Sequence, residues 1–144
     1  MKVGVVRFPE TTGHPEAAWA CRSLGWEPVD LGPETRALPE DLDLLLLPGG
    51  DPDDDALKAQ VQSPLGRLIP LQAERGRRVL GLGAGFAFLC ACDLLPGQLA
   101  WNPGDRLLHG PVRFRLERPL SGPTPWPAGQ LLELPVATRR GTYT

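Results

Sequence analysis

Three glycines in residues 81–85 mark the place in this chain where a catalytic nucleophile would be expected. Gly81, Gly83 and Gly85 follow an apolar run and open a helix-like stretch. This order of strand, sharp turn and helix is that of a nucleophile elbow, G-x-Nuc-x-G, which exposes a Ser or Cys on a strained turn. Glycines on either side allow such a turn without side-chain clashes. Because Gly83 occupies the nucleophile position, the pattern predicts the backbone of a catalytic site without its attacking side chain.

Other kinds of site find little support in the residue spacing. A dinucleotide fingerprint would need a third glycine at position 86, where Phe86 stands. An EF-hand loop beginning at Asp51 would need Gly at its sixth position and Glu at its twelfth, and neither is there. The acidic residues 51–55 instead suit the N-terminus of the following helix. His14 and His109 stand at no metal-ligand spacing. The sequence therefore predicts neither a cofactor nor a metal site.

The three cysteines are an odd number and do not form a C-x-x-C motif. We therefore interpret Cys21, Cys90 and Cys92 as small apolar side chains in helices of a protein from a reducing compartment. The alternative is that one of these thiols is a nucleophile, with His14 or His109 as its base.

The bulk composition describes an ordinary globular protein. The net charge is −2 and the pI about 5.7, so no overall positive field would attract nucleic acid. Residues 1–55 carry 12 acids and 4 bases, whereas residues 56–144 carry 5 acids and 11 bases. This asymmetry indicates two solvated surface regions or, alternatively, a polar partner surface. With no signal peptide and no apolar run long enough for a bilayer, we expect a cytoplasmic protein without a membrane partner.

Strand and helix patterns alternate over the first two thirds of the chain. Short apolar runs predict buried strands, and stretches bounded by Pro or Gly predict helices. The expected strands are residues 2–8, 26–31, 43–47 and 78–82, and the expected helices are residues 15–24, 54–62, 65–75 and 84–94. This alternation is typical of a parallel α/β sheet. We expect Trp19, in the first helix, to lie in the core.

The pattern changes after Pro96. Residues 112–117 alternate apolar and polar side chains, which predicts a half-exposed antiparallel strand with Arg113 and Arg115 on one face. Residues 121–127 are expected to be a loop, and residues 130–137 a further strand. The last third of the chain is therefore expected to form a small antiparallel β extension.

Several short motifs stand in one order along the chain. They are residues 7–9 (RFP), 47–50 (LPGG), the elbow, 94–97 (LLPG) and 134–137 (LPVA) with 141–143 (GTY). Together they resemble the class I glutamine amidotransferases over residues 1–144, and most closely the glutaminase subunits of phosphoribosylformylglycinamidine synthase, of purine biosynthesis. The resemblance implies one domain, a flavodoxin-like open parallel sheet with flanking helices, and a synthetase-type partner subunit.

The resemblance also implies roles for individual positions. Such enzymes hydrolyse glutamine with a Cys in G-x-C-x-G, activated by a His that a Glu orients, and two backbone N–H groups stabilise the oxyanion. Those donors would be Gly50, of the Gly49-Gly50 turn, and Ala84. Gly83 stands at the Cys position, and further departures from the family pattern are Ala84, Ala87, Thr138 and Arg140. The chain ends before the region that supplies the family's catalytic His and Glu.

Three functions are compatible with these residues. The first is a non-catalytic amidotransferase-like protein with a binding, scaffolding or regulatory role and a vestigial pocket at Gly49, Gly50, Gly83 and Ala84. The alternative is a glutaminase subunit whose chemistry is completed by partner chains. A third is a homo-oligomeric interaction module, since an incomplete sheet leaves an edge or an apolar face to cover.

Overall fold

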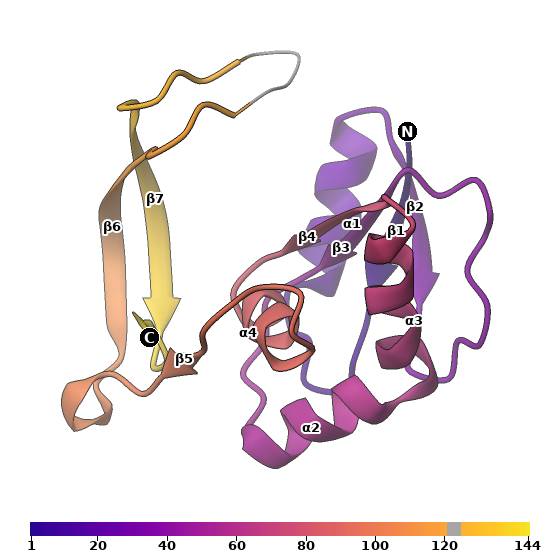
Figure 1. Cartoon of the computed structure of the whole chain (residues 1–144), viewed down its shortest axis with the longest axis horizontal. Coiled ribbons are helices and arrows are strands. Elements are labelled where there is room, and N and C mark those ends of the chain that lie inside the picture. Colours follow the sequence, from indigo (N-terminus) through magenta and orange to yellow (C-terminus); the bar gives the residue numbers. More distant parts are fainter. Residues whose placement is uncertain (121–124) are drawn as a thin grey trace. The chain divides into compact units, whose positions relative to one another are not determined.

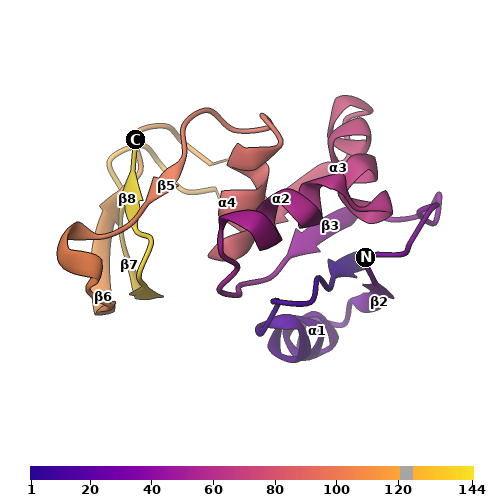
Figure 2. The same cartoon turned by 90° about the horizontal axis from the view of Figure 1, so that it is seen from below.

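Residues 1–98 form a four-stranded parallel sheet with helices on both faces (Figures 1 and 2). In the computed structural model, which describes residues 1–120 and 125–144, the strand order is β2-β1-β3-β4. The strands are β1 (Lys2–Val6), β2 (Glu27–Leu31), β3 (Leu44–Leu47) and β4 (Arg78–Gly81), and the helices are α1 (His14–Ser23), α2 (Asp54–Gln62), α3 (Pro64–Glu74) and α4 (Ala84–Ala91). This order is that of a flavodoxin-like sheet, and the predicted fold class is confirmed.

The larger part of the core lies between the sheet and helices α2, α3 and α4. Strand β3 consists of four leucines, as expected for a central parallel strand covered on both faces. Phe8, just after β1, stacks on Phe88 of α4 with ring centroids 5.3 Å apart. Both rings are buried. This contact fixes helix α4 against the end of β1 and thereby positions the turn that precedes the helix.

The opposite face of the sheet is covered by α1 alone (Figure 2). Ala18 and Cys21 are buried against the sheet, whereas Trp19 is 68% exposed. The expectation that Trp19 belongs to the core is therefore wrong. Successive helix residues are rotated by about 100°, so the neighbour of an inward-facing residue points away from the sheet.

Side chains cap the starts of both α2 and α3, and only the cap of α2 is predicted from the sequence. The Asp53 carboxylate accepts a hydrogen bond from the Ala56 N–H at 2.8 Å, and the Ser63 hydroxyl accepts one from the Gly66 N–H at 3.0 Å. Asp54 and Asp55 occupy the first turn of α2. The expected role of the acidic residues at the N-terminus of this helix is confirmed for Asp53, Asp54 and Asp55, since carboxylates stabilise this end of the helix dipole.

Residues 99–144 form two small antiparallel sheets. Their elements are β5 (Leu99–Ala100), a 3-10 turn (Pro103–Asp105), β6 (Leu108–Arg115), β7 (Leu131–Thr138) and β8 (Thr142–Tyr143), with β5 paired to β8 and β6 to β7. The predicted antiparallel extension is confirmed. Strand β6 begins four residues earlier than expected, so His109 lies within the strand and not before it. Asn102 is buried, and its side chain bonds to the backbone of Arg106, Thr138 and Gly141 at 2.9 Å each.

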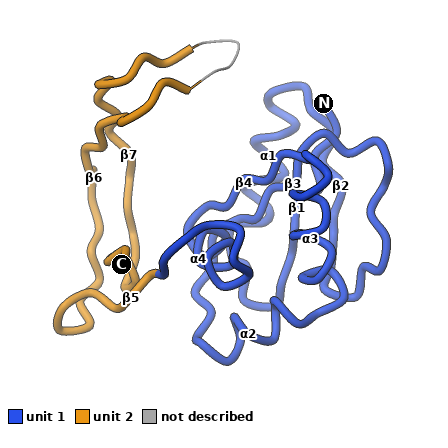
Figure 3. The backbone as a smooth tube through the Cα atoms, viewed as in Figure 1, with its two compact units in different colours: residues 1–98 blue, residues 99–144 orange. Residues whose placement is uncertain are grey.

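The backbone contacts divide the chain into two compact units, residues 1–98 and 99–144 (Figure 3). The expectation of one amidotransferase-like domain over residues 1–144 stays a prediction. Part of the expected loop at residues 121–127 lies outside the described residues. Among the helices that the structure describes, none has the length and apolar character to cross a bilayer.

Candidate functional site: a nucleophile elbow without a nucleophile

The turn between β4 and α4 has the backbone conformation that the glycine pattern predicts. Gly83 has φ 54° and ψ −115°, in a region that residues with side chains rarely adopt. Its carbonyl accepts hydrogen bonds from the N–H groups of Phe86 and Ala87 at 3.0 and 3.3 Å, so the residue immediately precedes the first helical turn. The chain thus makes a sharp strand-to-helix turn at the position where a nucleophile would project.

The three glycines of the turn are required for different reasons. A Cβ on Gly85 would overlap the carbonyl group of Leu47, and a Cβ on Gly81 would lie 2.6 Å from the carbonyl carbon of Gly85. These are backbone atoms that cannot move aside. A Cβ on Gly83 would meet only the Cα of Gly49, at 3.4 Å, an ordinary van der Waals distance. The outer glycines are therefore needed for packing, whereas the middle position has room for a side chain and is restricted only by its positive φ.

The Gly49-Gly50 turn lies beside the elbow. It follows β3, and its Gly49 is the neighbour that a side chain at position 83 would meet. The loop after β1 packs onto this turn, because the N–H groups of Thr12 and Gly13 donate to the Gly49 carbonyl at 3.1 and 3.0 Å. A Cβ on Gly50 would overlap the Glu10 carbonyl, so this position also requires glycine. The structure thus brings Gly49 and Gly83 together from segments more than 30 residues apart.

The two expected oxyanion donors retain their N–H groups. Ala84 is the first residue of α4, where backbone N–H groups have no partner within the helix. Among the described residues, neither the Gly50 N–H nor the Ala84 N–H donates a hydrogen bond. Backbone donors of this kind can bind a carbonyl or carboxylate oxygen whatever the neighbouring side chains are. Their role as an oxyanion pair stays a prediction.

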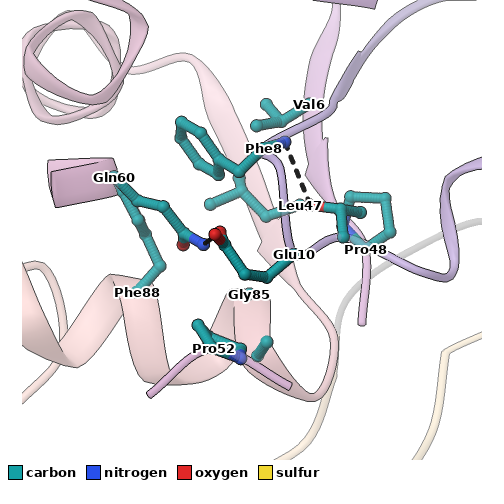
Figure 4. A pocket seen from close by; sticks show the side chains of 11 residues that line it. Val6, Phe8, Glu10, Leu47, Pro48, Pro52, Gln60, Gly85 and Phe88 are labelled. Atoms are coloured by element: carbon teal, nitrogen blue, oxygen red, sulfur yellow. Dashed lines mark hydrogen bonds between the residues drawn. The ribbon is translucent and has the colours of Figure 1, made fainter. Parts of the chain in front are cut away.

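A small cavity lies behind the elbow, between α4 and the ends of β1 and β3 (Figure 4). Its volume is about 10 Å³, which is room for about one water molecule and not for an amino acid. Gln60 of α2 is buried at its wall and donates a hydrogen bond to the Glu10 carboxylate at 2.7 Å (Figure 4). These two residues are 50 positions apart, and no sequence signal pairs them.

None of the three cysteine thiols replaces the missing nucleophile. Cys21 is buried among Val3, Val5 and Leu46 on the α1 face of the sheet. Cys90 is buried near the end of α4, and Cys92 follows the helix and is half-buried. Burial raises the pKa of each thiol, which lowers the share of the thiolate form that acts as a nucleophile. The interpretation of the cysteines as unpaired apolar side chains is confirmed for Cys21 and Cys90.

The histidines have no cysteine as their partner among the described residues. His14 is the first residue of α1, and its Nε2 lies 3.0 Å from Oδ1 of Asp30. Arg7 holds the same carboxylate with both Nε and Nη2, the latter at 2.9 Å. The hydrogen bond from Arg7 is the main reason why the pKa of Asp30 lies below its usual range. This Arg7–Asp30–His14 cluster joins the ends of β1 and β2, and the sequence alone did not indicate it.

The other positions that depart from the family pattern have local roles. Thr138, at the end of β7, donates its hydroxyl to the Arg140 carbonyl at 2.8 Å and accepts from the Arg140 N–H at 3.0 Å. The Arg140 guanidinium lies over the Trp101 ring, 4.2 Å from its centroid. Such a contact is a cation–π interaction. These residues thus stabilise the region around β5 and β7 and present no acid–base pair.

Two comparisons with known proteins, one of sequences and one of solved structures, lead to the same group of relatives. No protein-family model matches the chain. The chain is 39% identical to phosphoribosylformylglycinamidine synthase subunit PurQ of Rubrobacter xylanophilus, over 99% of the chain and 66% of that relative. The PurQ subunits of Methanopyrus kandleri and Cereibacter sphaeroides are 34% and 33% identical, and the chain covers 65% and 67% of their lengths. The chain therefore spans about two thirds of the length of these relatives.

A solved structure supports the same relationship. A chain in the structure of PurLQS from Thermotoga maritima matches with a TM-score of 0.84 at 26% identity. The match covers 99% of this chain and 68% of the other. The sequence matches and the structural match thus include the elbow, the Gly49-Gly50 turn and the antiparallel region.

Proposed function

The chain belongs to the PurQ family of phosphoribosylformylglycinamidine synthase subunits, and from this premise we propose that it is a PurQ-type subunit that does not hydrolyse glutamine. The observation that carries the proposal is Gly83 at the apex of the elbow. Hydrolysis through a thioester needs a thiolate that attacks the amide carbonyl. Gly83 has no side-chain atom, and burial raises the pKa of the thiols at positions 21, 90 and 92, which disfavours their thiolate forms.

The proposed role is that of a binding or scaffolding subunit. The N–H groups of Gly50 and Ala84 make no backbone bond among the described residues, which supports weak binding of a carbonyl or carboxylate oxygen beside the elbow. The similar chain of known structure comes from PurLQS. We infer from this that a synthetase-type subunit is the partner of the present chain.

A glutaminase completed by partner chains is the second candidate. It is favoured by the retained turn, since the backbone at Gly83 keeps φ 54° and ψ −115° and a Cβ there would meet only Gly49. A partner would have to supply the nucleophile as well as the base. This requirement places the second candidate behind the first.

A homo-oligomeric interaction module is the third candidate. Strand β4 pairs only with β3 among the described residues, which leaves an open sheet edge. Leu80 and Leu82 at that edge are 46% and 47% exposed. Open edges and exposed apolar side chains favour association. Light scattering across a range of protein concentrations distinguishes a self-associating chain from one that waits for a different partner.

The test of the first candidate uses the chain mixed with purified PurL- and PurS-type subunits. Synthase activity is measured with glutamine and, in parallel, with ammonium as the nitrogen source. A non-catalytic subunit predicts activity with ammonium, none with glutamine, and a complex detectable by sedimentation. Glutamine-dependent product formation that requires this chain would instead establish the second candidate.

A further inference from the structure

A second pocket lies at the amino ends of β3 and β4, whereas the elbow lies at the carboxyl ends of the strands. It is a surface depression of about 500 Å³. We call this depression the arginine pocket. Its polar lining consists of Asp43, Gln72, Arg75, Arg77 and Arg78. Most of these residues come from one segment of seven positions, the end of α3 and the turn into β4. The pocket lies wholly within residues 1–98.

The arginine pocket has more positive than negative charge. Arg75 and Arg78 are exposed and form no ion pair among the described residues. Asp43 is the single carboxylate in the polar lining, and its Oδ2 accepts a hydrogen bond from the backbone N–H of Lys2 at 2.7 Å. Two guanidinium groups are therefore free to bind an anion.

Arg77 has a different task from its two neighbours. Its Nη1 donates to the carbonyls of Leu42 and Pro39 at 2.6 and 3.3 Å, and its Nη2 donates to that of Glu40 at 3.2 Å. These bonds tie the loop before β3 to the turn before β4. Arg77 thus shapes the pocket and adds a positive charge, while its donors are used within the protein.

Gln72 gives the pocket a polar group whose carboxamide atoms are open to solvent, although most of the residue is buried. The residue is 8% exposed, and its carboxamide makes no hydrogen bond within residues 1–120 and 125–144. Because the carboxamide reaches the pocket and has no partner within the protein, it is available to donate a hydrogen bond to a ligand. The backbone fixes the position of Gln72, because its carbonyl accepts the Arg77 N–H at 3.0 Å.

We propose that the arginine pocket binds a small phosphorylated molecule through Arg75, Arg78 and the carboxamide of Gln72. Guanidinium groups present parallel N–H donors that match phosphate oxygens, and the carboxamide adds a neutral donor. The size of the depression lies within the range of small-molecule sites. A long polyanion such as nucleic acid is disfavoured, because residues 1–98 carry 14 acids and 9 bases and would repel it beyond the pocket. This site is independent of the elbow and of the proposed function.

The test is calorimetric titration of the chain with inorganic pyrophosphate at low salt. The double variant Arg75→Gln/Arg78→Gln is compared with Arg22→Gln/Arg36→Gln, which removes the same charge from exposed positions outside the pocket. We expect the first double variant to bind at least about tenfold more weakly, since each charge-assisted hydrogen bond contributes more than a neutral one. The control pair is expected to stay within about twofold of the native chain.

A second variant separates a built site from a general charge effect. Gln72→Met keeps the charge and nearly the size of the side chain but removes its hydrogen-bonding groups. We expect it to weaken pyrophosphate binding several-fold while the salt dependence of the affinity stays unchanged. The proposal is overturned if the native chain does not bind millimolar pyrophosphate. Equal losses in the two double variants, or full affinity in Gln72→Met, would also overturn it.

Discussion

The carboxyl and amino ends of the strands in residues 1–98 differ in what they offer a ligand. One end has an unusual backbone turn, and the other has unpaired charged side chains. At the carboxyl ends of the strands, Gly83 has the positive φ of a nucleophile elbow, but it carries no reactive side chain. At the amino ends of the strands, Arg75 and Arg78 carry unpaired charge, and the turn between them contains a left-handed glycine, Gly76 with φ 80°, of the kind that commonly ends a helix. The carboxyl ends therefore have the backbone turn but no reactive side chain. The amino ends have charged side chains on a common helix-to-strand turn.

This difference shows why a sharp turn of this kind does not depend on a side chain at its apex. The turn at the elbow is maintained by packing, because Gly81 and Gly85 lie against backbone atoms and cannot gain a side chain. A Cβ at position 83 would meet only the Cα of Gly49, at 3.4 Å, so the packing of the turn does not need a side chain there. Backbone conformation and side-chain chemistry are thus under separate physical constraints, and each can be tested separately.

The largest expected effect separates the outer from the middle glycine of the elbow. Gly85→Ala drives a methyl group into the carbonyl of Leu47, and we expect it to lower the free energy of unfolding by about 3 kcal/mol or more. Gly83→Ala has room for its Cβ and is opposed only by positive φ, which costs about 1–2 kcal/mol. Urea denaturation of both variants measures the difference. Equal losses would show that packing does not maintain the turn.

At the amino ends of the strands, we expect Arg77 and Arg75 to differ in how much each contributes to the free energy of unfolding. Arg77→Gln removes donors to three backbone carbonyls, and we expect a loss of about 1.5–3 kcal/mol in unfolding free energy. Arg75→Gln, on an exposed side chain without an ion pair, is expected to change it by less than about 0.5 kcal/mol. Urea denaturation measures both changes in unfolding free energy. An Arg77→Gln variant as stable as the native chain would contradict the structural role given to Arg77.

Much of this contrast could be predicted from the sequence, and the reasons differ by residue. The elbow was predictable because Gly81, Gly83 and Gly85 report a local backbone requirement within five positions. The four strands of the parallel sheet were predictable because runs such as Leu44–Leu47 are apolar on both faces. The exposure of Trp19 was not, because the limits of the apolar face of α1 depend on how the helix is rotated on the sheet.

Contacts between distant residues were also beyond the sequence. Glu10 and Gln60 meet across the cavity at the elbow, and Arg7 meets Asp30, only because the sheet brings their segments together. The position of Gln72 in the arginine pocket was equally hidden, since burial and pocket lining are properties of the folded chain. Local glycine patterns therefore predicted the geometry of the elbow, while tertiary structure was needed to find the second pocket.

A smaller effect concerns thiol reactivity at the elbow. Burial raises the pKa of Cys21, Cys90 and Cys92, so the native chain is expected to react slowly with iodoacetamide at neutral pH. A thiol introduced by Gly83→Cys would precede the N-terminus of α4, where the helix dipole favours the thiolate, and should react about tenfold faster or more. Mass spectrometry of the labelled protein identifies the modified position. Fast labelling of a native cysteine would contradict the burial argument.

The smallest expected effect is a pH dependence of the stability contributed by Asp30, near the carboxyl end of β2. Arg7 holds the pKa of Asp30 below its usual range, so the stabilising contribution is present above the unfolded pKa of about 3.9 and is lost as the pH falls through the lower folded value. Because the carboxylate is half-exposed, we expect Asp30→Asn to cost less than about 1 kcal/mol at pH 7. Melting temperatures of both proteins should converge toward pH 3. A gap that persists or widens in acid would contradict this account.

The most direct test of the central claim is ammonia release from glutamine by the purified native chain, with Gly83→Cys measured beside it. Because position 83 lacks a nucleophile and the pKa of each native thiol is raised, the account predicts that the native chain releases no ammonia above the protein-free blank. The variant shows whether the preserved turn alone supports any turnover once a thiol is restored. Saturable ammonia release by the native chain would contradict the account and would mean that another residue is the nucleophile.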